Sequence, residues 1–418
     1  MKVLVCGASG FIGRRLCARL RADGHEVVRG LRCASQPDEM EIDYSRDTSP
    51  AVWAPRLAGI DAVINTVGII AERPGSTFAN LHQRTPIALF HAAVQAGVRR
   101  VVQISALGAD SGTTEYFRTK AAADAALMRL PIEWLVLRPS LVYGEEGASS
   151  TSFRILATLP VIALPSLPEQ SRFQPVHVND LADAVSIALQ PQTSPRRCIE
   201  CVGSTHHTLR AMIGTYRQAF ALPTALWVTI PSAVMAMTAR FTGQIPGATL
   251  NPATWRMLQQ GNAADSSGFA LLLGRAPQGL AEFIGGPDAE RLRARALASW
   301  QCPLLRNSLA AVWILSALAS LFAFPRVDSM ALLARAGLSG AAAAACLYGA
   351  SAVDLVLGIA TLARPCRGTW IAQLALVVGY TIVIIVAMPE WLWHPFGPIL
   401  KNLPMLAILV VLASESRS

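Results

Sequence analysis

Residues 3–13 read Val-Leu-Val-Cys-Gly-Ala-Ser-Gly-Phe-Ile-Gly, and this stretch decides the fold. An apolar, partly β-branched run is typical of a buried parallel strand. Gly7 permits a tight turn, Gly10 leaves room for a pyrophosphate beside the backbone, and Gly13 lets the next helix pack against the strand. The sequence therefore predicts a strand, a glycine turn and a helix N-terminus that faces the phosphates of a dinucleotide.

The following 180 residues alternate between strand-like and helix-like patterns. This alternation predicts an α/β fold, a Rossmann-type doubly wound parallel sheet. The expected strands cover residues 26–32, 62–67, 101–105 and 133–138. The expected helices cover residues 14–22, 86–96, 115–129 and 180–189.

The end of the first domain has a different composition. Within a dinucleotide-binding domain of residues 1–300, segments 145–175 and 200–300 mix short helices with proline-rich turns and predict a small substrate subdomain. We expect the chain to return to the sheet only at residues 174–180. Residues 222–239 are apolar, but Pro223 and Pro231 favour a packed or membrane-surface helix over a membrane span.

The C-terminal region is apolar enough to enter a lipid bilayer. The chain is 52% hydrophobic and only 15% charged, and the excess is concentrated in four runs. These runs are apolar on all sides, which disfavours a soluble helical domain and predicts an all-α, four-helix transmembrane domain at residues 301–418. The expected spans are residues 308–325, 338–363, 370–388 and 398–413.

Arginine placement predicts the orientation in the membrane. Arginines precede the first expected span, lie between the second and third, and follow the fourth, whereas residues 389–398 contain no Arg or Lys. The positive-inside rule then predicts a multi-pass protein of the bacterial inner membrane with a cytoplasmic N-terminal domain, although Arg326 and Arg335 depart from it. The placement of arginines on one side of the membrane and the binding of nucleotide phosphates explain the net charge of +9. The charge therefore does not require a nucleic-acid partner. Cys198 and Cys201 are the only close cysteine pair, so we expect no metal site.

Tyr116 and Lys120 are the strongest candidates for chemistry. At positions i and i+4 they share one face of a helix. A nearby ammonium favours the phenolate, which would allow Tyr116 to act as an acid or base. Only three of the 36 basic residues are lysine, so a lysine at this position is informative.

The end of the second expected strand indicates the cofactor. Arg29 and Arg32 lie there, and no Asp or Glu follows before Asp38. An arginine at this place favours a ribose 2′-phosphate, so NADP(H) is favoured and NAD(H) remains possible. Asp43 is a further candidate, near the adenine. The complete set of expected cofactor-binding residues is Gly7, Ser9, Gly10, Phe11, Ile12, Gly13, Arg32, Asp43, Thr66, Val67, Gly68, Lys120 and Pro139.

Five motifs together give the first 300 residues a family resemblance. They are the glycine pattern at 7–13, Ser-Ala-Leu-Gly-Ala at 105–109, Tyr-Phe-Arg-Thr-Lys at 116–120, Leu-Arg-Pro-Ser-Leu-Val-Tyr-Gly at 137–144 and Val-His-Val-Asn-Asp at 176–180. The domain resembles an atypical short-chain dehydrogenase/reductase, in the branch of the NADPH-binding accessory subunit of respiratory complex I. Some members of this branch hold a nucleotide without turning it over.

The resemblance implies a Ser-Tyr-Lys set. Tyr116 would be the acid or base, Lys120 would hold the nicotinamide ribose and tune Tyr116, and Ser105 would polarise the substrate oxygen. Ser105 lies eleven residues before Tyr116, closer than the family's usual spacing. Either Ser105 contributes, or a hydroxyl at position 111, 113 or 114 replaces it, or the set is incomplete.

The C-terminal region is similar to DoxX-like membrane domains, at residues 354–358 and 394–404. Asp354 falls inside the second expected span, where a carboxylate suggests a functional or helix-pairing role. Its partner is either Lys401 or a nearby Ser, Thr or Tyr. The predicted protein is a membrane-tethered NAD(P)(H)-dependent oxidoreductase or epimerase for a carbonyl or alcohol of a lipid-like or quinone-like substrate. The alternative is a non-catalytic NADPH-binding structural or assembly protein.

Overall fold

A computed structural model describes residues 1–245, 248, 250–393 and 399–415. The chain divides into two compact units, Met1–Ala296 and Leu297–Ser418, and each is considered by itself. The sequence places this boundary four residues later, between residues 300 and 301.

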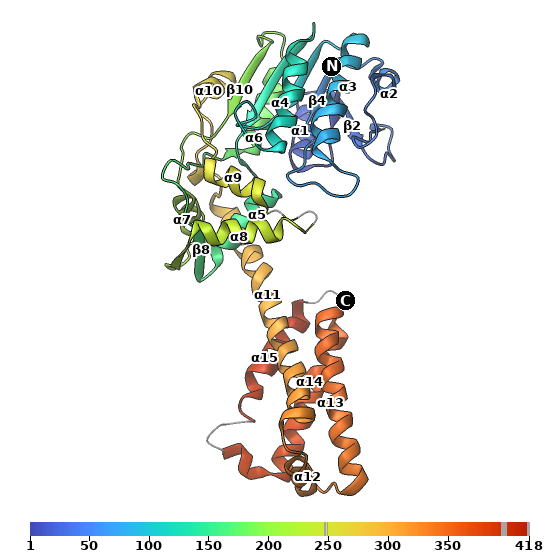
Figure 1. Ribbon diagram of the computed structural model, residues 1–418, viewed down its shortest axis with the longest axis vertical. Coiled ribbons are helices and arrows are strands. Elements are labelled where there is room, and N and C mark those ends of the chain that lie inside the picture. Colours follow the sequence, from blue (N-terminus) through green and yellow to red (C-terminus); the bar gives the residue numbers. More distant parts are fainter. Residues whose placement is uncertain (246–247, 249, 394–398, 416–418) are drawn as a thin grey trace. The chain divides into compact units, whose positions relative to one another are not determined.

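Unit 1 contains a seven-stranded parallel sheet of order β10-β6-β5-β4-β1-β2-β3 (Figure 1). The order reverses beside β1, as in a doubly wound Rossmann-type sheet, so the predicted α/β class is confirmed. The strands are β1 (Lys2–Cys6), β2 (Glu26–Leu31), β3 (Glu39–Glu41), β4 (Ala62–Asn65), β5 (Arg100–Ile104), β6 (Glu133–Pro139) and β10 (Arg197–Cys201).

Helices cover both faces of this sheet because its strands are apolar on both sides. Alternate side chains of β1 enter two separate cores: Val3 and Val5 join one, and Leu4 and Cys6 join the other. The first core is covered by α1 (Phe11–Ala22), α6 (Val178–Ala188) and α10 (Ser267–Leu273). The second is covered by α2 (Pro50–Trp53), η1 (Ala54–Leu57), η2 (Ala79–Arg84), α3 (Thr85–Gln95) and α4 (Glu115–Met128).

A third core, separate from the sheet, forms the remainder of unit 1. Its centre includes Tyr143, Phe173 and Tyr216, all buried. The elements of this part are β7 (Val142–Tyr143), α5 (Ala148–Thr158), β8 (Val161–Pro165), β9 (Val176–His177), α7 (Leu209–Ala219), β11 (Leu226–Ile230), α8 (Ser232–Thr242), α9 (Pro252–Gln260) and η3 (Leu280–Glu282).

The structure corrects two expectations in this region. Residues 174–180 do not rejoin the main sheet, because β9 pairs with β7 in a sheet of two strands; the returning strand is β10. Residues 222–239 do not form one helix either. Strand β11 ends at Ile230, Pro231 precedes helix α8, and β11 pairs with β8. Proline cannot continue a strand ladder but suits a helix start, which explains the break.

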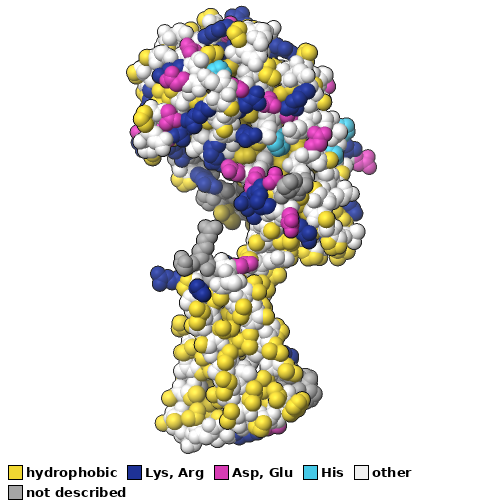
Figure 2. All heavy atoms as spheres, turned by 180° about the vertical axis from the view of Figure 1, so that it is seen from behind, with side chains coloured by type: hydrophobic (Ala, Val, Ile, Leu, Met, Phe, Trp, Pro, Cys, Tyr) yellow, Lys and Arg dark blue, Asp and Glu magenta, His cyan; other side chains and the backbone are white. Residues whose placement is uncertain are grey.

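Unit 2 is helical. Its elements are α11 (Gly286–Leu318), which begins in unit 1, η4 (Ala319–Ala323), α12 (Arg326–Arg335), α13 (Gly340–Ala363), α14 (Arg367–Ala387), η5 (Pro389–Trp393) and α15 (Asn402–Glu415). Among the described residues, three helices are long and apolar enough to cross a membrane: Asp288–Ala323, Gly340–Ala363 and Arg367–Ala387. Hydrophobic side chains are spread over the visible surface of this unit, and few charged side chains lie among them (Figure 2).

The fourth expected span is shorter in the structure. Helix α15 has 14 residues, about 21 Å at 1.5 Å per residue, which is less than the roughly 30 Å of a hydrocarbon core. Pro398, where the expected span begins, and His394 of the DoxX-like motif lie outside the described residues.

Buried polar side chains connect the long helices of unit 2. The Trp313 indole donates to Gln373 at 2.7 Å, and the Gln373 amide donates to Thr361 at 2.8 Å. The Tyr380 hydroxyl donates to Asp354 at 3.4 Å, whereas Lys401 is exposed. The partner that the structure gives Asp354 is therefore a tyrosine, one of the two alternatives left open by the sequence.

Candidate functional site

The site begins with the glycine turn after β1. Gly7 has a φ of +81°, which side-chain-bearing residues rarely adopt. A Cβ on Gly13 would lie 2.1 Å from the carbonyl oxygen of Gly7, so only glycine allows α1 to approach the turn this closely. Gly10 is the N-cap of α1 and provides no side-chain cap, which leaves the first-turn N–H groups available to an anion.

A cavity of about 330 Å³ opens at this turn. It lies at the carboxyl ends of β1, β2 and β4, where doubly wound folds bind their ligands. Seven of the expected cofactor residues line it: Gly7, Ser9, Gly10, Arg32, Thr66, Val67 and Gly68. Five further lining residues were not predicted: Gly30, Leu31, Ile42, Tyr44 and Leu81.

The unpredicted lining residues carry weak sequence signals. Tyr44 enters the site from a loop, and its hydroxyl donates to Asn65 at 2.9 Å. Leu81 comes from η2, beyond the expected elements. The run Met-Glu-Ile-Asp-Tyr at 40–44 alternates apolar and acidic residues, and this pattern indicates the short strand β3 and the buried side chains beside it.

The two arginines near the end of β2 differ in their surroundings. Arg29 forms ion pairs with Asp38 at 3.1 Å and Glu39 at 2.7 Å. Arg32 is exposed, lines the cavity, and has no ion pair within the part of the chain that the structure describes. Arg32 is therefore the one of the two whose guanidinium is free to meet a ligand phosphate.

Six expected cofactor residues, Lys120 among them, lie outside this lining. Phe11 lines a different cavity beside Gly144, and Ile12 packs against the first core. Gly13 lies where the backbone of α1 comes closest to the Gly7 carbonyl. Pro139 is buried at the end of β6. Asp43 accepts hydrogen bonds from the backbone N–H and hydroxyl of Ser45, which lower the pKa of its carboxyl group.

Lys120, the remaining expected cofactor residue, lies close to the cavity wall. A Cβ on Gly68 would be 3.5 Å from its Nζ. Thr114 caps the N-terminus of α4, and Tyr116, Lys120 and Asp124 follow on this helix at i, i+4 and i+8. The Lys120 Nζ donates to the carbonyl oxygen of Ile104 at 3.2 Å and lies 6.0 Å from the Tyr116 ring centroid.

Burial controls the ionisation of this pair. Burial lowers the pKa of Lys120 to about 8, because it removes the water that would solvate the ammonium. The negative charge of Asp124 acts in the opposite direction and raises this pKa. Burial also raises the pKa of Tyr116 to about 12. This direction is opposite to the sequence expectation, in which Lys120 lowers the pKa of Tyr116. In the structure, the cause of the shift is the burial of the phenol.

Ser105 forms a hydrogen bond with Asp124, a residue that was not expected in the site. Its hydroxyl donates to the buried carboxylate of Asp124 at 2.6 Å. Arg138 reaches the same carboxylate oxygen at 3.4 Å, while burial raises the pKa of Asp124. The serine is thus held at the end of β5 by a carboxylate one helical turn beyond Lys120.

His82 is a second missed neighbour of the Tyr-Lys pair. Its ring lies edge-to-face with that of Tyr116, with centroids 5.2 Å apart. Its Nε2 accepts from the backbone N–H of Ile69 at 3.0 Å, and burial together with Lys120 lowers its pKa to about 2. His82 therefore stays neutral and supports the Tyr116 ring.

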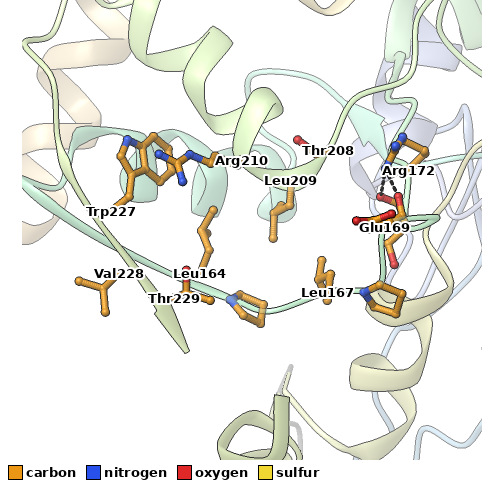
Figure 3. A pocket seen from close by; sticks show the side chains of 13 residues that line it. Leu164, Leu167, Glu169, Arg172, Thr208, Leu209, Arg210, Trp227, Val228 and Thr229 are labelled. Atoms are coloured by element: carbon orange, nitrogen blue, oxygen red, sulfur yellow. Dashed lines mark hydrogen bonds between the residues drawn. The ribbon is translucent and has the colours of Figure 1, made fainter. Parts of the chain in front are cut away.

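A further cavity, of about 280 Å³, lies beside β8 and β11 (Figure 3). The guanidinium of Arg210 stacks over the Trp227 ring at 4.8 Å, and Leu164 and Leu209 contribute apolar lining. None of the catalytic or cofactor residues expected from the sequence lines this cavity.

The comparisons with known proteins agree with this architecture. Residues 7–158 match the NAD(P)H-binding family, and residues 310–410 match the DoxX-like family. The chain thus carries an NAD(P)H-binding domain of the atypical short-chain dehydrogenase/reductase class, related to a complex I subunit and to ceramide reductase, followed by a DoxX-like domain.

Two relatives illustrate the relationship. The chain is 30% identical over 208 residues to the NADH dehydrogenase [ubiquinone] 1 alpha subcomplex subunit 9 of Arabidopsis thaliana, covering 46% of this chain and 50% of the relative. It is 29% identical over 186 residues to the ceramide reductase of Caulobacter vibrioides, covering 43% and 58%. The chain thus spans about half the length of these relatives.

Solved structures show the same fold. An NADPH-dependent quinone oxidoreductase from Escherichia coli, complexed with NADPH, superimposes with a TM-score of 0.53 at 17% identity, covering 68% of this chain and 98% of the other. A UDP-N-acetylglucosamine 4-epimerase from Bacillus cereus gives 0.53 at 15% identity, covering 71% and 96%. At these identities the likeness concerns the fold alone.

Replacing Gly10 with valine should abolish nucleotide binding. A Cβ there would already lie 3.2 Å from the Gly7 carbonyl, and a branched side chain would enter the cavity at the helix N-terminus. Calorimetry with NADPH measures the loss. Gly214→Ala is the matched control, since a Cβ at this position meets nothing within 4 Å. Retained binding in Gly10→Val would contradict the assignment of the glycine turn.

Arg32→Glu should narrow or reverse a preference for NADPH over NADH. The variant loses a charge-assisted bond to the 2′-phosphate, which costs roughly 1.5–3 kcal/mol. The measurement is the ratio of the two dissociation constants. Arg129→Glu makes the same charge change at an exposed residue that does not line the cavity. Equal affinities of the parent protein for the two nucleotides would show that Arg32 selects nothing.

Proposed function

We propose that this chain is a membrane-anchored, NADP(H)-dependent oxidoreductase acting on a carbonyl or alcohol group of a lipid-like or quinone-like molecule. The observation that carries the proposal is the position of Lys120. Its ammonium lies beside Gly68 at the cavity wall and one helical turn from the Tyr116 phenol. A cation at this place can hold a ribose while a phenol donates a proton.

Each side chain has a definite part in this reaction. The bound nicotinamide nucleotide supplies or accepts a hydride. In the reductive direction Tyr116 donates its hydroxyl proton to the carbonyl oxygen. A phenol with a raised pKa is fully protonated at neutral pH, so the donor form is the resting form. Ser105 orients the same oxygen once its hydroxyl proton turns away from Asp124, to which it donates at 2.6 Å in the structure.

The named relatives support the choice of substrate class. The Caulobacter relative is a ceramide reductase, so its substrate is a lipid. A protein anchored by its own apolar helices meets hydrophobic molecules at high local concentration. We extend this class to the present chain, and an epimerase using the same tyrosine belongs to the same proposal.

A non-catalytic role is the second candidate, and one observation favours it. The Ser105 hydroxyl donates a hydrogen bond to Asp124 at 2.6 Å, and the residue is only 4% exposed, so the hydroxyl is occupied before any substrate arrives. The Arabidopsis relative is named as a subunit of an NADH dehydrogenase. Turnover of NADPH with a short-chain quinone or a carbonyl-containing ceramide analogue separates the two functions.

Tyr116→Phe should remove most turnover and leave NADPH affinity nearly unchanged, because it deletes a proton donor and little volume. General acids contribute about a hundredfold to ten-thousandfold to the rate. Steady-state kinetics and calorimetry on the same preparation measure both quantities. Tyr216→Phe, which removes a buried hydroxyl in the third core and outside the lining of this cavity, is the matched control. An unchanged rate in Tyr116→Phe would support the non-catalytic role.

The rate of turnover should decrease as the pH rises above about 8. Lys120 is an ammonium below its pKa of about 8 and loses its charge as the pH rises through this value. kcat/KM should therefore fall above pH 8, because it reports groups of the free enzyme. Lys120→Arg keeps the charge and should move this decrease to higher pH. A flat profile through pH 8 in the parent protein would mean that this charge is not required.

We further propose that unit 2 crosses a bacterial inner membrane four times, with unit 1 in the cytoplasm. The three long apolar helices supply three spans, and α15 supplies the fourth. Arg364, between α13 and α14, and Arg367, the first residue of α14, lie on the cytoplasmic side in this topology. An even number of spans returns the C-terminus to the side of the N-terminus.

Reporter fusions test this topology. A fluorescent protein fused after Ser418 should be active, and alkaline phosphatase fused at the same place should be inactive, because the C-terminus is cytoplasmic. Fusions after Glu390 should give the opposite result. Phosphatase activity at Ser418 would show that the number of spans is odd and that α15 does not cross.

A further inference from the structure

Unit 1 exposes apolar side chains that its own cores do not cover. They come from β8, β11 and α8. Figure 1 shows β8 and α8 at the same end of this unit, and β11 pairs with β8. We propose that these elements rest on the surface of an anionic lipid bilayer, the same bilayer that holds unit 2. The inference rests on the proposed membrane anchoring and adds a second, peripheral contact of the nucleotide-binding domain with lipid.

The outer face of the β8–β11 pair is apolar. The two strands are parallel, with Leu226 opposite Val161 and Val228 opposite Ala163. All four of these side chains are exposed, and Leu226 is 65% accessible. Their neighbours Ile162 and Leu164 point the other way into the third core. A two-stranded sheet with apolar residues on both faces has an outer surface without a partner within the described unit.

Helix α8 presents a matching stripe. Val234, Met237 and Phe241 occur at i, i+3 and i+7 and therefore share one face. Met237 is 56% exposed and Phe241 is 64% exposed, whereas Ala239 on the other face is fully buried. The helix is attached to unit 1 on one side and apolar toward solvent on the other. This is the pattern of an interfacial helix.

The charges around these elements favour an anionic partner. Between Glu200 and Asp265 the sequence contains no Asp or Glu, and it contains four arginines. Arg240 and Arg256 line a cavity of about 590 Å³ between α8 and α9, with Trp255 and Pro252. Both arginines are exposed, and neither forms an ion pair within the described residues. Guanidinium groups beside apolar side chains fit lipid phosphates at the edge of hydrocarbon.

The connection between the units favours a bilayer over a soluble partner. Helix α11 is continuous from Gly286 to Leu318, so the end of unit 1 and a candidate membrane span belong to one helix. Unit 1 cannot move far from a bilayer that contains this span. Arginines without acidic neighbours would also repel each other across a two-fold contact between two copies of this surface.

Photo-crosslinking of the full-length chain tests the proposal. The chain is reconstituted in nanodiscs of phosphatidylethanolamine and phosphatidylglycerol with p-benzoylphenylalanine at Leu226 or Phe241, and lipid adducts are identified by mass spectrometry. Leu271 on α10 is the matched control, since it is 73% exposed and belongs to the same unit. Ile382 in α14 reports insertion of unit 2.

The expected result is lipid adducts at residues 226, 241 and 382 and none at 271. Adducts at 382 alone would overturn the surface contact and leave the anchoring intact, whereas their absence at 382 would overturn the anchoring itself. Crosslinks from residue 241 to a second copy of the chain would replace the proposal by a homo-oligomeric interface. Equal lipid labelling at residues 271 and 241 would show that lipid contacts exposed apolar residues of unit 1 regardless of their position. This result would also contradict the proposal.

The arginines are tested in the same assay. The double variant Arg240→Ala, Arg256→Ala should reduce the adduct yield at residue 241 severalfold in discs with phosphatidylglycerol and leave it unchanged in discs of phosphatidylcholine alone. Arg129→Ala, at the end of α4, should change neither yield. An equal loss in both lipid compositions would contradict a role of charge.

Discussion

The close approach of helix α1 to the end of strand β1 is the constraint on which the nucleotide site depends. A single Cβ on Gly13 would lie 2.1 Å from the Gly7 carbonyl, well inside van der Waals contact. This approach brings the uncapped first turn of α1 to the carboxyl edge of the sheet. Arg32 follows β2 and Gly68 follows β4, and both line the cavity there because these two strands pair with β1.

Helix α4 contributes the remaining chemistry through one buried face. Tyr116, Lys120 and Asp124 follow each other at single-turn intervals, with Ser105 from β5 bound to the last of them. Burial is the first cause of the pKa shifts of all three ionisable groups, and the charges of Lys120 and Asp124 each oppose the pKa shift of the other. The neutral His82 and the protonated Tyr116 follow from this environment.

The two units place their apolar side chains differently. Unit 1 buries its apolar strands under helices on both faces, whereas the long helices of unit 2 keep most of their apolar side chains on the outside. The few polar groups inside unit 2, such as Trp313, Gln373 and Thr361, bond to each other across helices. In a low-dielectric setting an unpaired polar group is costly, so these bonds hold specific helices together.

The sequence by itself determined the parallel α/β sheet, the glycine turn, the shared face of Tyr116 and Lys120, and the apolar C-terminal helices, because each depends on residues close together in the chain. Only the tertiary structure decided that Asp38 and Glu39 engage Arg29 and leave Arg32 free, that Asp124 holds Ser105, and that β10 rather than β9 completes the sheet. The two-stranded pairing of β8 with β11 also joins segments about 65 residues apart, where a local pattern suggested one helix. Side-chain pairing and strand order depend on which distant segments meet, and local periodicity does not contain this information.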